Sequence, residues 1–473
     1  MKEIITDRIP AVSRFYNSQN QALTDFDFKF EGALDYKAIC YFVATGFFLR
    51  DTTYFKNLKT IDPSTKLSVE DNNIKRQEQV WDWHYSPRDI TLEQAVDEFA
   101  ELLAKITKEQ VGDNQVVVPL SGGLDSRTQA AVLGSYKDVL SYSYKFENGK
   151  DENFYAEAVA KAQGFDHTSY VIPKAYLWDI IDEIATLNHC LSDFTHPRPM
   201  AIKKEIAKMG DVFFLGHWGD VLFDDMDVSQ EMSEEEQVQG LYKKVVKKGG
   251  AGLAQQLWEA WDLEGTFEES FRADVAEMLA GIKIDNMDAK IRAFKSKYWA
   301  PRWTSTNLCV WQDLKPTFLP FYHDEMCEFI CTIPEKYLAG RQIQIEYLKK
   351  YTPQLAEIPW QSFHPLNLYN YKDYYTSSQL PKRIKSKIKR EFNERILRKP
   401  PTTLRNWELQ FLGESNDKKL KEYIFGDKDF ERFIPKSIVA DIYINFKEKD
   451  AVWYSHPLSM LLTLSVFTKK RAV

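Results

Sequence analysis

The sequence predicts an α/β protein built around a mostly parallel sheet, with a small α+β module before the sheet and a mainly helical part after it. Between residues 116 and 216, strand-like and helix-like segments alternate, as expected for βαβ crossovers that form a parallel sheet covered by helices. After Asp227 the chain reads as helical and irregular, without further clear strands. The length of 473 residues is about three times a common domain size of roughly 150 residues. We therefore predict three parts, at residues 1–92, 93–375 and 376–473.

The first part combines strand and helix patterns. Residues 25–36 alternate between apolar and polar side chains, which predicts a strand. Residues 35–48 have helical periodicity, and residues 60–83 are typical of short strands around a turn. A long helix is then expected to begin after Thr91, whose side chain is a candidate N-cap.

The alternating segments of the second part predict the parallel sheet and its crossover helices in order. The strands are predicted at 116–120, 139–146, 168–172 and 211–216. The helices are predicted from residue 125 and at 152–165, 175–189 and 198–210. A ligand is expected in the crevice at the carboxyl ends of these strands.

Composition excludes several classes of protein. The net charge of -7, from 62 basic and 69 acidic residues, gives no general attraction to nucleic acid. The five cysteines are odd in number and include no CxxC pair, so we predict reduced thiols, with Cys327 and Cys331 in the core rather than in a metal site. The chain begins without an apolar leader and has no apolar run of about 20 residues, so no membrane contact and a cytoplasmic location are expected.

One local charge cluster stands out against this balance. Residues 382–399 carry nine basic side chains and two acidic ones. A solvated basic helix face is the simpler interpretation, and a surface for phosphate, nucleic acid or an acidic partner is the alternative.

The segment 116–133, "VVVPLSGGLDSRTQAAVL", places a glycine turn between a strand and a helix. Gly122 and Gly123 let the backbone approach an anion, and the amides of the turn and of the helix start carry partial positive charge. The turn lacks the lysine of a GxxxxGK[ST] loop, so a different use of ATP is implied. Asp125 would repel phosphates unless Mg²⁺ lay between them. The predicted nucleotide-binding loop comprises Leu120, Ser121, Gly122, Gly123, Asp125 and Ser126.

This order of strand, Ser-Gly-Gly-Leu-Asp-Ser and helix resembles the SGGxDS signature of the PP-loop ATP pyrophosphatases, which cleave ATP to AMP and pyrophosphate. A second segment, 212–225 ("VFFLGHWGDVLFDD"), resembles the SGEGxDExFGGY segment of glutamine-dependent asparagine synthetases. The resemblance adds Gly216 and Gly219 to the nucleotide site and places Asp220 on the second Mg²⁺ carboxylate beside Asp125. It extends from about residue 30 to the end.

The resemblance implies a PP-loop fold and an AMP-forming reaction with ATP and Mg²⁺. In that family a carboxylate attacks the α-phosphate, and the acyl-adenylate is captured by ammonia or an amine to give an amide. Residues 1–92 then correspond to a shortened glutaminase-like remnant, residues 93–375 to the PP-loop domain, and residues 376–473 to the helical end of the synthetase part. The expected substrate is a small-molecule or peptide carboxylate other than free aspartate.

The sequence departs from the family in the part that corresponds to the glutaminase, which supplies nitrogen. Residue 2 is Lys2 where the glutaminase has its nucleophilic cysteine. Nitrogen is then expected from free ammonia, from a separate amidotransferase, or from an amine on the substrate, as in β-lactam synthetases and lasso-peptide cyclases. His217 replaces the family's glutamate, and with an ordinary pKa near 6.5 it is either a general base or a polar turn residue. Val221 replaces an acidic residue.

A further departure concerns a catalytic cation. Ser362 occupies the slot where family members often have a lysine, and His364 follows two residues later. Loss of such a group costs about 2.7 to 4 kcal/mol of transition-state stabilisation when nothing replaces it. Lys372, Arg341 and the 382–399 run are candidate replacements, and His217, His364 and Lys372 are the predicted catalytic residues.

Three alternatives stay open beside the amide synthetase. The enzyme could transfer the adenylated carboxylate to an acceptor other than nitrogen, or the chain could be a catalytically weakened ATP-binding partner protein, as Ser362 and Val221 suggest. A nucleic-acid-modifying PP-loop protein that uses residues 382–399 is the third and least favoured alternative, because the net charge is negative.

Overall fold

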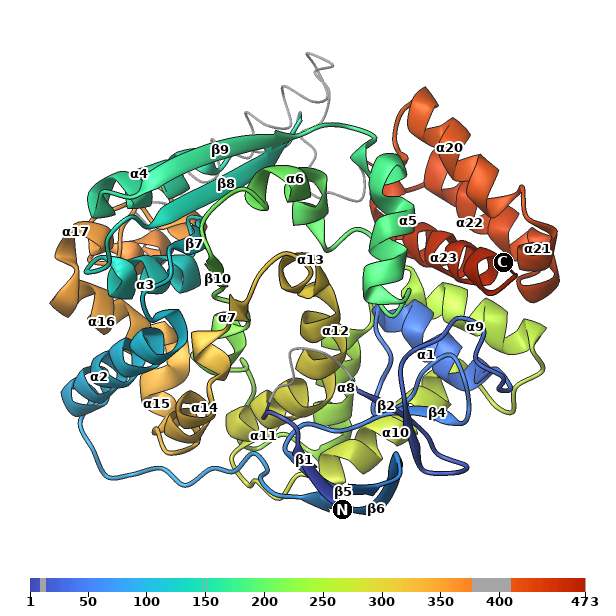
Figure 1. Cartoon of the computed structure of the whole chain (residues 1–473), viewed down its shortest axis with the longest axis horizontal. Coiled ribbons are helices and arrows are strands. Elements are labelled where there is room, and N and C mark those ends of the chain that lie inside the picture. The colour runs from blue at the N-terminus through green and yellow to red at the C-terminus, as the bar shows by residue number, and fades with distance from the viewer. Residues whose placement is uncertain (9–13, 148, 150, 377–409, 473) are drawn as a thin grey trace.

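The computed structural model describes residues 1–8, 14–147, 149, 151–376 and 410–472. The basic run at 382–399 therefore lies outside the described residues. Figure 1 shows a parallel sheet at the upper left, a second sheet near the N-terminus at the bottom, and the last helices at the upper right. The predicted α/β fold class with a mostly parallel sheet is confirmed.

The larger sheet has five strands in the order β11-β10-β7-β8-β9, and every neighbouring pair is parallel. Four of its strands match the predicted ones, whereas the edge strand β11 has only two residues and was not predicted. The chain runs outward from β7 on one side and continues through β10 on the other. The strand order thus reverses between β7 and β10, where ligands bind in open α/β sheets. The strands are β7 (Val116–Pro119), β8 (Leu140–Phe146), β9 (Asp166–Ile172), β10 (Val212–Phe214) and β11 (Thr317–Phe318).

The helices of this region follow the predicted order. Helix α2 begins after Thr91, where the Thr91 side chain accepts from the Gln94 amide and the Gln94 side chain accepts from the Thr91 amide. The predicted helix at 198–210 is wrong in part, because a 3₁₀ turn at Arg198–Ile202 precedes a single α-helical turn, α6 (Lys203–Ile206). Beyond α6, the Lys315 ammonium donates to the carbonyls of Met209 and Gly210, just before β10. The other helices here are α2 (Leu92–Val111), α3 (Leu124–Leu133), α4 (Asn153–Gln163), α5 (Tyr176–Asn188) and α7 (Gly219–Leu222).

The smaller sheet is antiparallel, with the order β1-β5-β6-β3-β2-β4. The predicted strands around a turn at 60–83 are confirmed, because β5 and β6 form a hairpin through two residues of positive φ, Asp71 and Asn72. The six strands are β1 (Lys2–Ile5), β2 (Phe15–Asn17), β3 (Ala22–Thr24), β4 (Leu58–Thr60), β5 (Thr65–Glu70) and β6 (Asn73–Gln79).

The predicted strand at 25–36 is wrong, because this segment is mostly irregular, with a turn at residues 28–29 and an isolated bridge between Leu34 and Phe55. The Asp27 carboxylate accepts from the Lys29 amide at 2.9 Å, and the Asp27 carbonyl accepts from the Phe30 amide at 3.1 Å. These local bonds replace a ladder and direct the aromatic rings inward, so that the centroids of the Phe30 and Phe55 rings lie 5.3 Å apart. The alternating pattern therefore reflects a phenylalanine at every second position that packs against the core.

Beyond Asp227 the described chain is mainly helical, as predicted. Helix α1 packs on α9 and α23, and one continuous core includes residues from Phe15 to Phe467. The division into three domains stays a prediction. The remaining helices are α1 (Tyr36–Thr45), α8 (Glu234–Val245), α9 (Gly250–Ala260), α10 (Phe267–Ala280), α11 (Met287–Phe294), α12 (Ala300–Asn307), α13 (Cys309–Gln312), α14 (Asp324–Cys331), α15 (Glu335–Leu338), α16 (Gln342–Tyr351), α17 (Pro353–Ala356), α20 (Glu414–Ile424), α21 (Lys428–Phe433), α22 (Lys436–Glu448) and α23 (Ala451–Ala472).

Two predictions about composition can be compared with this fold. Cys327 and Cys331 are free and buried, as expected for core thiols, and burial raises the pKa of Cys331 to about 12. Among the described residues, none of the helices combines the length and the apolar character that a bilayer-spanning segment requires.

The junction between α1 and α23 contains a buried histidine that we expect to make the protein sensitive to acid. The His456 ring lies 2.9 Å from the Val43 carbonyl through Nε2, and burial lowers the pKa of His456 to about 4. Between that value and an unfolded pKa near 6.5, only the unfolded chain binds the proton, so stability is present above pH 6.5 and falls towards pH 4. From pH 7 to 4.5, His456 should cost about 2.5 kcal/mol of unfolding free energy.

Urea unfolding of the wild type and His456→Gln at both pH values measures this cost, because Gln retains an N–H donor without a titrating ring. The acid-induced loss of stability should be smaller in the variant by that amount. An equal loss in both proteins would contradict the assignment.

Candidate active site

The glycine turn after β7 is held in shape by two serines. The Ser126 hydroxyl accepts from the Ser121 amide at 3.1 Å and lies 2.9 Å from the Ser121 hydroxyl, which accepts from the Gly123 amide at 3.2 Å. Gly123 is the N-cap of α3 and makes no side-chain cap, so the first amides of this helix can receive an anion. The turn thus leaves helix amides without a side-chain partner, and its role as a phosphate cradle stays a prediction.

The turn also fits closely against a distant segment. A Cβ on Gly122 would lie 2.6 Å from Cβ of Gln361, and the Gln361 amide donates to the Gly122 carbonyl at 3.4 Å. Ser362 and His364 follow Gln361 and are exposed, so the segment with the replaced lysine lies beside the turn. Leu120, by contrast, is buried in the core, and only its backbone borders the site.

Arg127 joins these two segments and was missed by the sequence analysis. The guanidinium is fully buried and donates to the carbonyls of Leu355, Ile358 and Pro359 at 3.1, 2.9 and 3.0 Å. Burial lowers the pKa of Arg127 to about 10, so the group keeps its charge at neutral pH. An arginine directly after the Ser-Gly-Gly-Leu-Asp-Ser turn is the one sequence signal that could have indicated it.

The carboxylates Asp125 and Asp220 meet where the strand order reverses. Gly219, at the start of α7, is so close that an added Cβ would lie 2.2 Å from Oδ1 of Asp125. Asp220 is the next residue and is exposed, whereas the Asp125 side chain is 23% exposed. Burial raises the pKa of Asp125, and the charge of Asp220 adds to this effect. Both carboxylates are thus at least partly accessible to solvent.

Asp125 already has two protein partners. It forms an ion pair with Arg341, and the Gln344 side-chain amide donates to its Oδ1 at 3.2 Å. Arg341 has a φ of 61° directly before α16, a left-handed conformation that turns this helix start towards Asp125. Of the two candidate replacement cations among the described residues, Arg341 and Lys372, the structure brings Arg341 to Asp125.

The other predicted side chains lie farther out. Lys372 is exposed, and its Nζ lies 5.9 Å from the centre of the Tyr371 ring. The exposed His364 ring packs edge-on against Phe154 and Tyr155, with centroid distances of 6.0 and 5.8 Å. These contacts place His364 at the border of the glycine turn and Lys372 on the surface of a neighbouring 3₁₀ turn.

His217 has a lower basicity than the sequence suggested. Its ring packs edge-on against Trp311 at 5.2 Å, and its Nδ1 has no hydrogen-bond partner among the described residues. Burial lowers the pKa of His217 to about 4, which corrects the expected value near 6.5. The imidazole is therefore neutral at pH 7 and is a weak general base.

Lys295 is a second residue that the sequence analysis missed. It begins a π-helical segment, Lys295–Trp299, and its Nζ lies 5.7 and 5.5 Å from the ring centres of Trp218 and Trp299. Burial lowers the pKa of Lys295 to about 8, while Asp220 opposes this shift. Such π-helical insertions often occur at functional sites. No local sequence pattern marks this lysine.

Several buried polar atoms around the two carboxylates lack partners. Nε1 of Trp218 and both amide atoms of Gln129 make no hydrogen bond in the described part of the chain. The Gln129 amide lies against Gly216, where an added Cβ would be 2.7 Å from its oxygen. Buried polar groups are normally paired, so these atoms are available to hydrogen-bond a polar ligand.

The residues fit an ATP-Mg²⁺ complex. The described residues include no group of three or more His, Cys, Asp or Glu side chains that could hold a metal alone. Mg²⁺ with a nucleotide usually needs only one or two carboxylates, because phosphates and water supply the other oxygens. Asp125 and Asp220 beside the glycine turn satisfy this requirement.

Comparison with known proteins identifies the family of this chain. None of the curated proteins compared with the chain is similar enough to match. Among solved structures, the chain is similar to an NMN synthetase from Francisella tularensis, at 11% identity over 44% of this chain and 92% of that chain, with a TM-score of 0.21. The sequence model of the asparagine synthase family matches residues 98–351, more than half of the 473 residues, and this range includes both carboxylates. The chain therefore belongs to the asparagine synthase family.

Proposed function

We propose that this protein is an ATP-dependent ligase that cleaves ATP to AMP and pyrophosphate, activates a carboxylate, and transfers the acyl group to ammonia or an amine. The observation that carries the proposal is the meeting of Asp125 and Asp220 beside a glycine turn with open helix amides. Membership of the family supports an amide-forming or adenylating reaction in general.

Different groups of the chain would bind the phosphates of ATP and its Mg²⁺. The amides of Gly122, Gly123 and the start of α3 bind phosphate oxygens, and Asp125 and Asp220 hold Mg²⁺. When bound, Mg²⁺ neutralises charge on the phosphates and on the departing pyrophosphate. Arg341 balances the charge of Asp125 in the structure, and we infer that phosphate oxygens take over part of its hydrogen bonding when ATP binds.

The proposed reaction has two steps. A carboxylate oxygen of the substrate attacks the α-phosphorus, and the bond to pyrophosphate breaks. The amine nitrogen then attacks the acyl carbon, loses a proton, and displaces AMP. In this proposal the nitrogen comes from ammonia, a separate amidotransferase or a substrate amine.

Lys295 supplies the cation that Ser362 cannot. It lies near Asp220 and is mostly protonated at neutral pH with a pKa of about 8. Lys295→Met should reduce the rate of AMP formation by about 10²- to 10³-fold, the effect of losing one preorganised charged group. Lys295→Arg should retain more activity, because it preserves the charge.

The matched control is Lys297→Met, in the same π-helical segment. Lys297 forms an ion pair with Asp82 at 2.5 Å, so it should affect AMP formation little. Steady-state rates at saturating ATP measure all three variants. Equal rates for Lys295→Met and the wild type would remove Lys295 from the mechanism.

The decisive test of the function is product analysis. The protein is incubated with ATP, Mg²⁺, ammonium and a panel of carboxylates, and nucleotides are separated by chromatography. AMP and pyrophosphate that form only with a particular carboxylate support the proposal, and ADP as the product would refute it. AMP without an amide product would favour an acceptor other than nitrogen.

A second candidate is an ATP-binding partner protein without catalysis of its own. The exposed Ser362 beside the glycine turn and the apolar Val221 after Asp220 favour this alternative. It predicts ATP binding by calorimetry but no AMP under any of these conditions.

A further inference from the structure

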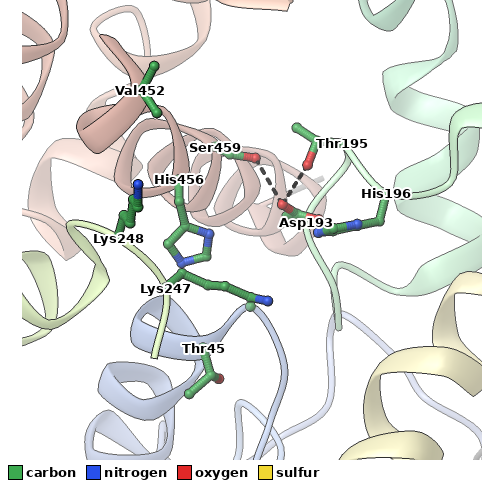
Figure 2. A pocket seen from close by; sticks show the side chains of 10 residues that line it. Thr45, Asp193, Thr195, His196, Lys247, Lys248, Val452, His456 and Ser459 are labelled. Carbon is green, nitrogen blue, oxygen red and sulfur yellow. Dashed lines mark hydrogen bonds and ion pairs between the residues drawn. The ribbon is translucent and has the colours of Figure 1, made fainter. Parts of the chain in front are cut away.

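A separate cavity of about 100 Å³ lies where four distant segments meet: the end of α1, the loop after α5, the turn between α8 and α9, and α23. Figure 2 shows side chains from all four converging on it. This volume is roughly the volume that three water molecules occupy in the liquid. A ligand that fits inside is therefore no larger than the smallest amino acids.

Asp193 presents an unsatisfied carboxylate oxygen in this cavity. Its side chain is 4% exposed. Oδ2 accepts from the Thr195 hydroxyl at 2.7 Å and from the Ser459 hydroxyl at 3.4 Å, as Figure 2 shows. Oδ1 has no hydrogen-bond partner among the described residues, and Nε2 of His196 is 3.9 Å away. A buried carboxylate oxygen normally has a donor, so this oxygen calls for an N–H or O–H group of a ligand.

The imidazoles in the cavity do not supply the missing positive charge. Burial lowers the pKa of both His196 and His456 to about 4, so both rings are neutral at pH 7. Nε2 of His456 is engaged with the Val43 carbonyl at 2.9 Å. A ligand ammonium would therefore meet Asp193 without competition from a histidine cation.

The positive charge at the cavity comes from two lysines of another segment. Lys247 and Lys248 are consecutive residues in the turn before α9, and Figure 2 shows their side chains on opposite sides of the His456 ring. Lys248 is exposed, and Lys247 is half-buried with its Nζ 5.3 Å from the centre of the Trp299 ring. The cavity thus has one anionic and two cationic groups, an arrangement complementary to a molecule that carries both charges.

The cavity adjoins the candidate active site through tryptophan rings. Nζ of Lys247 lies 5.3 Å from the centre of the Trp299 ring. Nζ of Lys295, the cation near Asp220, lies 5.5 Å from the same ring centre. The His196 ring packs edge-on against Trp303 at 4.9 Å, and Trp303 lies 6.4 Å from Trp218. Two residues that line the cavity, Lys247 and His196, thus contact indoles that in turn contact Trp218, two residues before Asp220.

We propose that this cavity binds a small zwitterionic amino acid, with its ammonium on Oδ1 of Asp193 and its carboxylate towards Lys247 and Lys248. Simple amines are disfavoured because the lysines repel them, and simple carboxylates are disfavoured because Asp193 repels them. The binding itself does not depend on the proposed ATP chemistry. The amino acid is either the nitrogen donor of the ligase or a separate ligand that acts on it.

Calorimetry on the full chain without ATP tests the site, with glycine, acetate and methylamine as probes. Glycine should bind at least ten-fold more tightly than either half-molecule. Asp193→Asn should weaken glycine binding at least ten-fold, because the amide keeps the shape of the side chain without its charge. The control Asp179→Asn, on the exposed face of α5, should leave glycine binding unchanged.

Lys248→Gln provides a second variant at an exposed position, where folding is not at risk. It should weaken glycine binding and leave methylamine binding the same or stronger. Equal binding of glycine and acetate, or no glycine binding by the folded wild type, would overturn the proposal.

Two further measurements separate this inference from the ligase function. Asp125→Asn should bind glycine as the wild type does, whether or not the wild type forms AMP. Incorporation of ¹⁵N-glycine into an ATP-dependent product would identify a nitrogen donor. A changed rate of AMP formation without incorporation would identify a separate ligand that acts from the cavity.

Discussion

Asp125→Asn is expected to reduce ATP-dependent AMP formation by about 10³-fold or more, the largest effect on activity that we predict. The amide has the same shape as the carboxylate, so it can remain beside Gly219 and Gln344. It lacks the negative charge that would hold Mg²⁺ against the phosphates. The loss should appear in the turnover rate at saturating ATP and Mg²⁺, and raising Mg²⁺ should restore only a part of it.

The control for this experiment is Asp138→Asn, on the exposed turn between α3 and β8. Asp138 has a φ of 56°, a conformation that asparagine also adopts readily, so this variant should be fully active. Melting temperatures of both variants show whether loss of the Arg341 ion pair unfolds the protein. Full activity of a folded Asp125→Asn would remove this carboxylate from the metal site.

Arg127→Met is expected to lower the free energy of unfolding by about 3 kcal/mol or more. The guanidinium serves three carbonyls of residues 355–359, and each buried carbonyl left without a donor costs about 1 to 3 kcal/mol. Removing the buried charge recovers a part of this cost. Because Gln361 lies on Gly122, ATP binding should weaken as well.

Urea unfolding and limited proteolysis measure the two consequences. Arg127→Lys should fall between the wild type and Arg127→Met, because one ammonium cannot reproduce the guanidinium geometry. Arg76→Met, at a 72% exposed side chain of β6, should stay within about 0.5 kcal/mol of the wild type. If Arg127→Met were as stable as the wild type and equally resistant to protease near residue 360, Arg127 would not hold this segment.

Local patterns in the sequence predicted much of the fold. The predicted strands at 116–120 and 211–216 and the helix start after Thr91 depend on neighbouring residues, and each is present as β7, β10 and α2. The same local information predicted that Asp125 and Asp220 follow two strands, which brings them together once those strands are adjacent and parallel. The proposed roles of these side chains stay predictions.

Other local patterns gave the wrong structure, because packing outweighed periodicity. Residues 25–36 alternate like a strand, but they follow an irregular path. Their aromatic rings pack against a core built from distant segments. The two-residue strand β11 is too short to have a periodicity, and it exists because β10 offers an edge.

The sequence by itself determined four of the five strands of the parallel sheet, the glycine turn, the carboxylates after two strands, and the resemblance to the family. The tertiary structure alone decided which far-apart residues meet: Arg127 with residue 355, Lys295 with the tryptophans near Asp220, and Asp193 with α23. The tertiary structure also decided how basic the side chains are, since burial lowers the pKa of His217 to about 4. Backbone preferences and glycine freedom act over a few residues and can be read locally. Burial and charge balance depend on every segment packed around a group, and therefore exist only in the folded chain.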